Sequence, residues 1–309
     1  MNDWSGLRAV RSYLELVRFS HTIFALPFAF LSATWAWRLS SREAGVMTYA
    51  FTWRAGLGVL LCMVAARSFA MAVNRLADRN YDAQNPRTMG RHLPSGRLPV
   101  GEVQIFAASC GAAFVGATLL FLPNVWPVLL SVPVLLVLAG YSYAKRWTVF
   151  VHFWLGTALG LAPICAWIAV RGQPLSLDLR DLIPAFLLGV GVLLWVAGFD
   201  VIYACQDTDI DRRLGLKSLP AWLGNEVALK VAAGCHALML VPLLLIPWVA
   251  PQLQLSWLYG IGLLLVASLL WYEHSIVSAH DLQRINLAFF QANAVISLIL
   301  LLAGGLDAW

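Results

Sequence analysis

The chain has 309 residues, of which 60% are hydrophobic and only 12% are charged. Soluble domains carry about 25% charged residues, so this composition excludes an ordinary soluble protein and indicates an integral membrane protein. The net charge of +5 does not indicate nucleic-acid binding, because the basic residues are scattered among short connections between apolar runs.

Apolar stretches of about 20 residues, each long enough to cross a bilayer as a helix, follow one another along the whole chain. They leave no room for a sizeable soluble domain, so we expect an all-α membrane protein with one domain over residues 1–309. The first run has no convincing cleavage site and should remain in place. Nine spans are expected: Phe19–Trp37, Ala55–Ala77, Val103–Phe121, Val125–Tyr143, Phe150–Val170, Leu182–Ala204, Val227–Trp248, Leu255–Tyr272 and Leu287–Leu306.

The lysines and arginines predict the orientation of these spans. With nine spans, the N-terminus and every second connection lie on one side of the membrane. Fifteen of the 21 basic residues fall on that side and five on the other, while Arg67 lies within the second span. The positive-inside rule makes the rich side cytoplasmic. We therefore expect a multi-pass protein of the inner (plasma) membrane with a cytoplasmic N-terminus.

A ladder of polar residues ends the second expected span. Asn74, Asp78 and Asp82 follow one another at four-residue intervals. On an α-helix this spacing places all three side chains on one face, one turn above another. The spacing therefore predicts a single site that presents several oxygen atoms.

A second ladder ends the sixth expected span. Tyr203, Asp207 and Asp211 repeat the four-residue spacing, displaced by 129 positions, and Asp200 lies on the same predicted helical stripe. Because four spans separate the two ladders, both should lie at the cytoplasmic ends of their helices. We expect them to converge on a central cavity that is open to that side.

The paired acids favour a metal site. Acidic residues near membrane depth rarely face lipid and are candidates for function. The alternative is ordinary solvated charge at helix ends, paired with neighbouring arginines. Two ladders of identical spacing favour Mg²⁺, which takes oxygen ligands and completes its shell with water and phosphate. Asp78, Asp82, Asp207 and Asp211 are the candidate metal ligands, and a diphosphate is the candidate substrate.

Basic residues on the same side offer contacts for a diphosphate. Arg87 and Arg91 lie in an irregular loop after the first ladder, and Lys145 lies in the fourth connection. Arginine matches phosphate oxygens with two parallel hydrogen bonds, although the positive-inside rule also accounts for such charge. Tyr203 either orients a carboxylate or phosphate or is a membrane-interface tyrosine. Arg67 either meets a carboxylate on an organic substrate or pairs with an acidic side chain.

The two ladders together resemble the paired aspartate-rich motifs of the UbiA superfamily of intramembrane aromatic prenyltransferases. The similarity extends to residues 20–28, 85–88, 141–146 and 215–220 and covers most of the chain. Within the superfamily the chain is most similar to the bacterial 4-hydroxybenzoate polyprenyltransferase group, which includes relatives assigned to menaquinone synthesis.

This resemblance implies nine helices around a central cavity, two Mg²⁺ ions on the aspartate motifs and a polyprenyl diphosphate whose tail leaves toward lipid. Asn74 would bind on the metal–diphosphate face, and the basic loop residues and Lys145 would hold the diphosphate. The implied reaction attaches the polyprenyl group to a ring carbon of an aromatic acid, most simply 4-hydroxybenzoate in ubiquinone synthesis. Asp200, or Asp78 or Asp207 of the ladders, would act in catalysis, with Asp200 nearest the acceptor.

Two alternatives remain open at this point. One is the same reaction on a dihydroxynaphthoate, which would place the enzyme in menaquinone synthesis. The other belongs to a different class, a transporter of divalent cations or phosphate. A transporter should carry ionisable groups along the full depth of the membrane. The acidic ladders gather at the cytoplasmic ends instead, which favours the enzyme.

Overall fold

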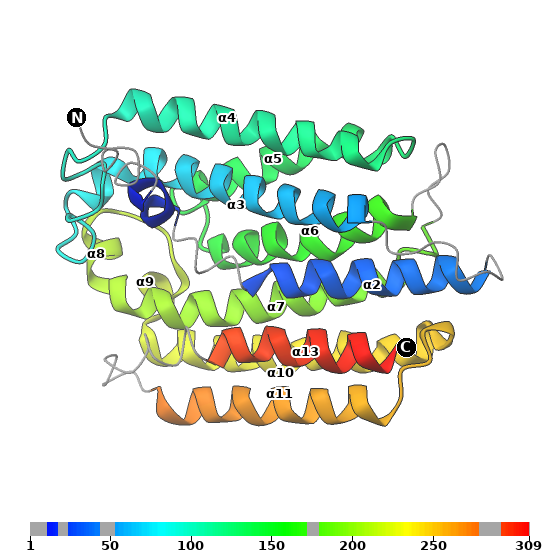
Figure 1. Cartoon of the computed structure of the whole chain (residues 1–309). Coiled ribbons are helices and arrows are strands. Elements are labelled where there is room, and N and C mark those ends of the chain that lie inside the picture. The colour runs from blue at the N-terminus through cyan, green and yellow to red at the C-terminus, as the bar shows by residue number, and fades with distance from the viewer. Residues whose placement is uncertain (1–10, 18–23, 44–52, 172–178, 278–291, 309) are drawn as a thin grey trace.

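The long helices of the protein run side by side in one bundle (Figure 1). The computed structural model describes residues 11–17, 24–43, 53–171, 179–277 and 292–308. The starts of the first and last expected spans, from Phe19 and from Leu287, lie outside these ranges. The long helices are α2 (Leu26–Glu43), α3 (Trp53–Asp82), α4 (Val100–Thr118), α5 (Trp126–Ala144), α6 (Val151–Arg171), α7 (Ile183–Ala204), α10 (Asn225–Val249), α11 (Trp257–Ile276) and α13 (Asn293–Asp307).

Short helical turns extend or connect these helices. They are η2 (Leu119–Phe121), η3 (Cys205–Asp207), α8 (Thr208–Arg213), α9 (Leu219–Leu223) and η4 (Pro251–Leu253). The turns α8 and α9 lie at the same end of the bundle as the connection that follows α3 (Figure 1). This end of the bundle therefore gathers the segments that follow the two ladders.

Six helical segments of the described chain are long and apolar enough to cross a membrane. They are α3, α4 with η2, α5, α6, α7 through α8, and α10, and α13 is a shorter apolar helix. The protein is therefore a multi-pass helical membrane protein. Each of the nine expected spans overlaps one of the long helices, while the count of nine crossings and the direction in which the cavity opens stay predictions.

Helix α7 packs against α6 on one side and α10 on the other. Two glycines allow the first of these contacts. A Cβ atom built on Gly160 would lie 2.6 Å from the carbonyl oxygen of Gly189, and one on Gly189 would lie 2.7 Å from that of Gly160. Small residues let helix backbones approach closely in a membrane. The packing holds α6 and α7 in a fixed relation.

Aromatic side chains fill the core between α2, α7, α11 and α13. Phe28, Trp35, Trp195 and Tyr259 are each at most 2% exposed. The indole nitrogen of Trp35 donates a hydrogen bond of 2.9 Å to the carbonyl oxygen of Gly304, so this polar group is satisfied inside the core. This core holds α2, α7, α11 and α13 together, and the cavity described below lies where α2 and α7 meet α3, α5 and α6.

The two ladders rest on different backbones. Helix α3 continues to Asp82, five residues beyond the expected end of its span, so the first ladder lies on one helix as predicted. The expectation of one continuous helix under the second ladder was wrong. Helix α7 ends at Ala204, Asp207 lies in the 3₁₀ turn η3, and Asp211 lies in α8. Neither Gly nor Pro lies between Asp200 and Asp211, so the sequence carries no conventional signal for this break.

Candidate active site

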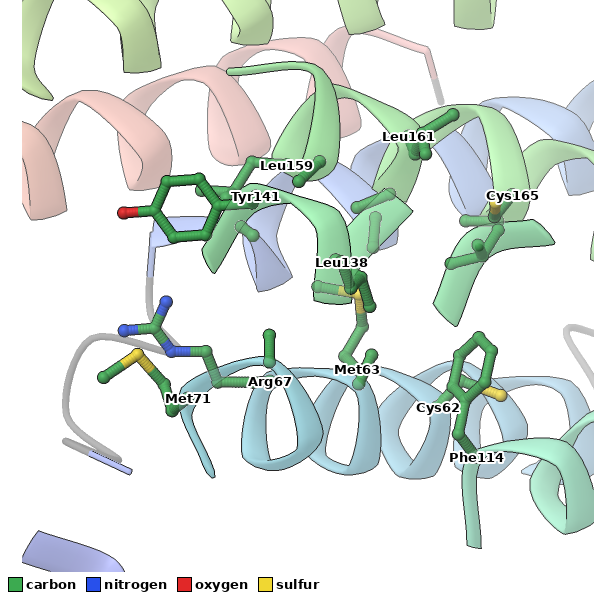
Figure 2. Close-up of a pocket in the computed structure, with 18 of the residues that line it drawn as sticks. Cys62, Met63, Arg67, Met71, Phe114, Leu138, Tyr141, Leu159, Leu161 and Cys165 are labelled. Atoms are coloured by element: carbon green, nitrogen blue, oxygen red, sulfur yellow. The ribbon is translucent and has the colours of Figure 1, made fainter. Parts of the chain in front are cut away.

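A cavity of about 300 Å³ lies between α2, α3, α5, α6 and α7. Its wall changes character along its length. Arg67, Met71 and Tyr141 lie toward one end, and Cys62 and Phe114 lie toward the other (Figure 2). The polar residues of the wall include Arg67, Asn74, Arg75, Arg91, Tyr141, Asp200 and Tyr203. One end of the cavity is therefore charged and the other end is almost wholly apolar.

The first ladder is buried and paired with cations from other segments. Asp78 and Asp82 are 4% and 6% exposed. Asp78 Oδ2 accepts hydrogen bonds from Asn74 Nδ2 at 3.2 Å and from Lys145 Nζ at 2.8 Å. Both carboxylate oxygens of Asp82 accept from Arg91 Nη1, at 2.8 and 2.9 Å. A buried carboxylate is costly unless it is paired, and each of these two acids has a cation within hydrogen-bond distance.

The loop after α3 reaches across to the second ladder. Arg87 Nε donates to Asp207 Oδ1 at 3.0 Å, its Nη2 bonds the other oxygen, and its Nη1 donates to the Tyr203 hydroxyl at 2.7 Å. Asn85 Nδ2 also donates to Asp207 Oδ1, at 3.1 Å. Burial by itself would lower the pKa of Arg87, but its hydrogen bond and charge contact with Asp207 raise that pKa above its usual value. The guanidinium stays charged and ties the loop after the first ladder to the second ladder.

The connection after α8 is tied to the end of α5. Ser218 Oγ donates a hydrogen bond of 2.8 Å to Asp211 Oδ2. The backbone nitrogen of Lys217 donates to the carbonyl oxygen of Lys145 at 2.7 Å. Lys145 therefore lies next to both ladders, since its side chain pairs with Asp78 and its backbone holds the segment that binds Asp211. The two sets of acids meet at one end of the cavity.

Asp200 lies on the cavity wall, apart from the arginine and lysine pairs. Its side chain is 20% exposed, and its Oδ2 lies 2.7 Å from Nδ1 of His152 on α6. Arg67 and Tyr141 lie on the same wall. A carboxylate, a cation and a phenol therefore line one compartment beside the ladders.

The donor set fits Mg²⁺ bound together with a phosphate-containing ligand. Asp78 Oδ1 is buried, and within the described ranges it has no hydrogen-bond partner, so a ligand atom for a cation is already in place. Among the residues that the structure describes, no three His, Cys, Asp or Glu side chains are placed to hold a metal by themselves. Mg²⁺ is usually held by one or two carboxylates together with substrate phosphates and water, so paired acids suit it.

The predicted residues fall into two groups. Arg67, Asn74, Arg91, Asp200 and Tyr203 form part of the cavity wall. The other predicted residues do not line the cavity and are connected to the wall or to one another by the hydrogen bonds described above. They are Asp78, Asp82, Arg87, Lys145, Asp207 and Asp211. The sequence had indicated all of these residues, and the structure brings the two ladders to one end of the cavity.

Three residues of the site had no predicted role. Asn85 and Tyr141 lie in the segments 85–88 and 141–146 that carry the family resemblance, and the structure shows that Asn85 binds Asp207. Tyr141 lines the cavity from an apolar helix. His152 was the most visible omission, because an ionisable residue at the start of an apolar run is itself a signal of function or of a buried polar contact.

These features define the class, a multi-pass helical membrane protein with an internal cavity that is charged at one end and apolar at the other. Residues 25–295 match the model of the UbiA prenyltransferase family. The chain therefore belongs to this family, and the protein is a prenyltransferase. The transporter alternative is set aside by this assignment.

Known relatives agree along most of the chain. The 4-hydroxybenzoate octaprenyltransferase of Chromohalobacter salexigens is 28% identical over 288 residues, which is 92% of this chain and 89% of that protein. The apo structure of a UbiA homolog from Aeropyrum pernix K1 superposes with a TM-score of 0.77 at 29% identity and covers 91% of this chain and 95% of that one. A UbiA homolog from Archaeoglobus fulgidus, solved with DMAPP and Mg²⁺, shares the fold with a TM-score of 0.66 at 19% identity, over 96% and 99% of the two chains.

Proposed function

We propose that this enzyme transfers a polyprenyl group from polyprenyl diphosphate to a ring carbon of 4-hydroxybenzoate, as a step of ubiquinone synthesis at the cytoplasmic face of the inner membrane. The cavity is the observation that carries the proposal, because its charged end joins directly to an apolar end. A substrate with an anionic head and a hydrocarbon tail has the same division. The relatives named 4-hydroxybenzoate octaprenyltransferase support the choice of acceptor.

The diphosphate would bind between the ladders and their cations. Arg87, Arg91 and Lys145 each form a charged hydrogen bond to a ladder carboxylate. These cations are held on two separate segments around one space, Arg87 and Arg91 on the loop after α3 and Lys145 at the end of α5. Guanidinium groups match phosphate oxygens well. A diphosphate that enters this space takes over part of their hydrogen bonding.

Mg²⁺ is the proposed cofactor at the same place. Asp78, Asp82, Asp207 and Asp211 would hold it, with Asn74 beside them. Bound there, it would neutralise the charge that develops on the departing diphosphate. The carboxylates in turn balance the positive charge of the neighbouring arginines and lysine.

The isoprenoid tail would occupy the apolar end of the cavity. Cys62, Phe114 and Phe121 lie on its wall there. This surface excludes water, which would otherwise react with an allylic cation. Aromatic ring faces also stabilise positive charge at short range. The apolar end therefore both accommodates the tail and protects the reactive carbon.

The aromatic acid would bind beside Arg67, whose guanidinium pairs with its carboxylate. The allylic C–O bond breaks and its electron pair leaves with the diphosphate. The ring carbon beside the phenol oxygen then forms the new C–C bond, and the proton on that carbon passes to the carboxylate of Asp200. Asp200 suits this role because it lies on the cavity wall outside the cation pairs of the ladders.

A prenyl-transfer assay on the purified protein tests this proposal. We expect Mg²⁺-dependent product with 4-hydroxybenzoate, no product in EDTA, and little product with 4-hydroxybenzamide, which lacks the carboxylate. R67Q should raise KM for 4-hydroxybenzoate and leave KM for the polyprenyl diphosphate unchanged. Product with a dihydroxynaphthoate and none with 4-hydroxybenzoate would move the enzyme to menaquinone synthesis.

A further inference from the structure

His152 connects the cavity to the segment that carries the second ladder. It is the second residue of α6 and is 2% exposed. Its Nδ1 lies 2.7 Å from Oδ2 of Asp200, and its Nε2 accepts a hydrogen bond of 3.3 Å from the backbone nitrogen of Leu219. Leu219 begins α9, so its N–H has no acceptor within that helix. Both ring nitrogens of a wholly buried histidine are therefore engaged.

The bond from Leu219 determines where the proton of His152 lies. A backbone N–H only donates, so Nε2 must be the unprotonated acceptor nitrogen of the ring. The remaining proton then resides on Nδ1 and is donated to Asp200. The imidazole is neutral, and the contact is a hydrogen bond to a carboxylate rather than an ion pair.

This arrangement leaves one oxygen of Asp200 for chemistry. His152 occupies Oδ2, and within the described part of the chain Oδ1 has no hydrogen-bond partner, although Asp200 lines the cavity. A carboxylate that is held at one oxygen loses its rotational freedom and presents the other oxygen in a fixed direction. Orientation of this kind is a recognised contribution to catalysis.

We propose that His152 is a positioning residue for prenyl transfer, a neutral imidazole that fixes Oδ2 of Asp200 so that Oδ1 faces the acceptor. This inference rests on the proposed function, in which Asp200 takes the ring proton. His152 does not relay that proton onward, because its second nitrogen is occupied by Leu219. Its role is to hold the carboxylate in place.

The same contact links Asp200 to the second ladder. Ser218 donates to Asp211, and the next residue, Leu219, donates to His152. Two successive residues thus attach one segment both to a ladder acid and to the partner of Asp200. Through His152, Asp200 beside the proposed acceptor is therefore held at a fixed distance from Asp211 of the second ladder.

Three substitutions separate the two bonds of the imidazole. Asparagine in H152N places its amide near Nδ1 and keeps a donor for Asp200, while glutamine in H152Q reaches toward Nε2 and keeps only the acceptor for Leu219. H152F fills the space and makes neither bond. We expect H152Q and H152F to lower kcat roughly 10- to 100-fold with KM for the polyprenyl diphosphate unchanged. H152N should recover most of the lost kcat.

A matched control removes a different buried histidine. His236 on α10 is also 2% exposed and also bonds through both ring nitrogens, to His274 and to the carbonyl oxygen of Trp195. It does not line the cavity. H236N should lower thermal stability and leave kcat of the folded enzyme near the wild-type value. Equal loss of kcat in H152N, H152Q and H152F would assign His152 a merely structural role and overturn the proposal.

A spectroscopic measurement tests the proton position without turnover. In protein labelled with ¹⁵N-histidine, the difference between wild type and H152N isolates the His152 signals. We expect a neutral ring protonated on Nδ1, and a ring protonated on Nε2 or on both nitrogens would overturn the inference. Full activity in D200N would instead remove Asp200 from the proposed reaction, so failure of the function and failure of the positioning role remain distinguishable.

Discussion

The two acidic ladders have the same spacing in the sequence and different backbones in the structure. Asp78 and Asp82 lie on one uninterrupted helix, α3, whereas Asp207 and Asp211 are divided between a 3₁₀ turn and the short helix α8. The relative positions of the acids in the first ladder are fixed by the geometry of one helix. The register of the second depends on bonds from other segments, chiefly those of Arg87. Equal spacing therefore predicts shared chemistry more safely than it predicts shared backbone geometry.

Removal of one acid from each ladder should have the largest effect. D78A and D207A should each lower turnover by at least about 1000-fold, because each deletes a carboxylate that would hold the Mg²⁺ that offsets the charge on the departing diphosphate. Prenyl transfer by purified, folded protein at saturating Mg²⁺ measures this loss. The two values should be similar if the ladders contribute equally to one site.

Asp209 provides the control for this pair. It lies between Asp207 and Asp211 in the sequence but is exposed. D209N should retain wild-type turnover, since it removes a charge of the same kind two residues after Asp207 without touching the cavity. Full activity in D78A would contradict the equal importance of the two ladders.

Loss of the contact between the loop after α3 and the second ladder should have an intermediate effect. R87Q removes the charged contacts with Asp207 and the hydrogen bond to Tyr203, and should raise KM for the polyprenyl diphosphate by roughly 10- to 100-fold. R87K keeps the charge but not the paired hydrogen bonds, so it should fall between R87Q and the wild type. Steady-state kinetics at varied diphosphate concentration would separate the three proteins.

Arg79 is the matched control for Arg87. It lies on the exposed side of α3, and within the described part of the chain its side chain donates only to the backbone carbonyl oxygen of Leu76, on its own helix. R79Q should leave KM for the diphosphate unchanged. An equal increase in KM for R79Q and R87Q would show that general positive charge, rather than the contact of Arg87 with the second ladder, attracts the substrate.

The sequence predicted the parts of the site that local periodicity determines. Asn74, Asp78 and Asp82 follow the helical repeat, and the structure places them on α3 as expected. Arg87, Arg91 and Lys145 were identified because basic residues gathered on the side of the ladders, and each contacts a ladder acid. Opposite charges concentrated at one end of a helical bundle have few other ways to be satisfied.

The rest depended on contacts between distant segments. Asn85 and Asp207 are separated by 122 residues, and no local pattern specifies their hydrogen bond. Helix α7 ends at Ala204 although no glycine or proline lies nearby on its C-terminal side, so we attribute this end to tertiary contacts. His152 is recognisable as an ionisable residue in an apolar run, but its partner, Asp200, follows only from the packing of α6 against α7.

Ser218 offers the smallest and most selective test of the comparison. Its hydroxyl donates to Asp211 and also accepts the N–H of Ala221 as the N-cap of α9. S218A should lower the free energy of unfolding by about 1 kcal/mol, measured as a reduced thermal midpoint in detergent, and lower kcat only a few-fold. S268A, at an exposed position of α11, should change neither quantity. Because the first ladder lies on the continuous helix α3, S218A should disturb only the second ladder. A loss of turnover as large as that of D207A would mean that α9, rather than Arg87, holds the second ladder in place.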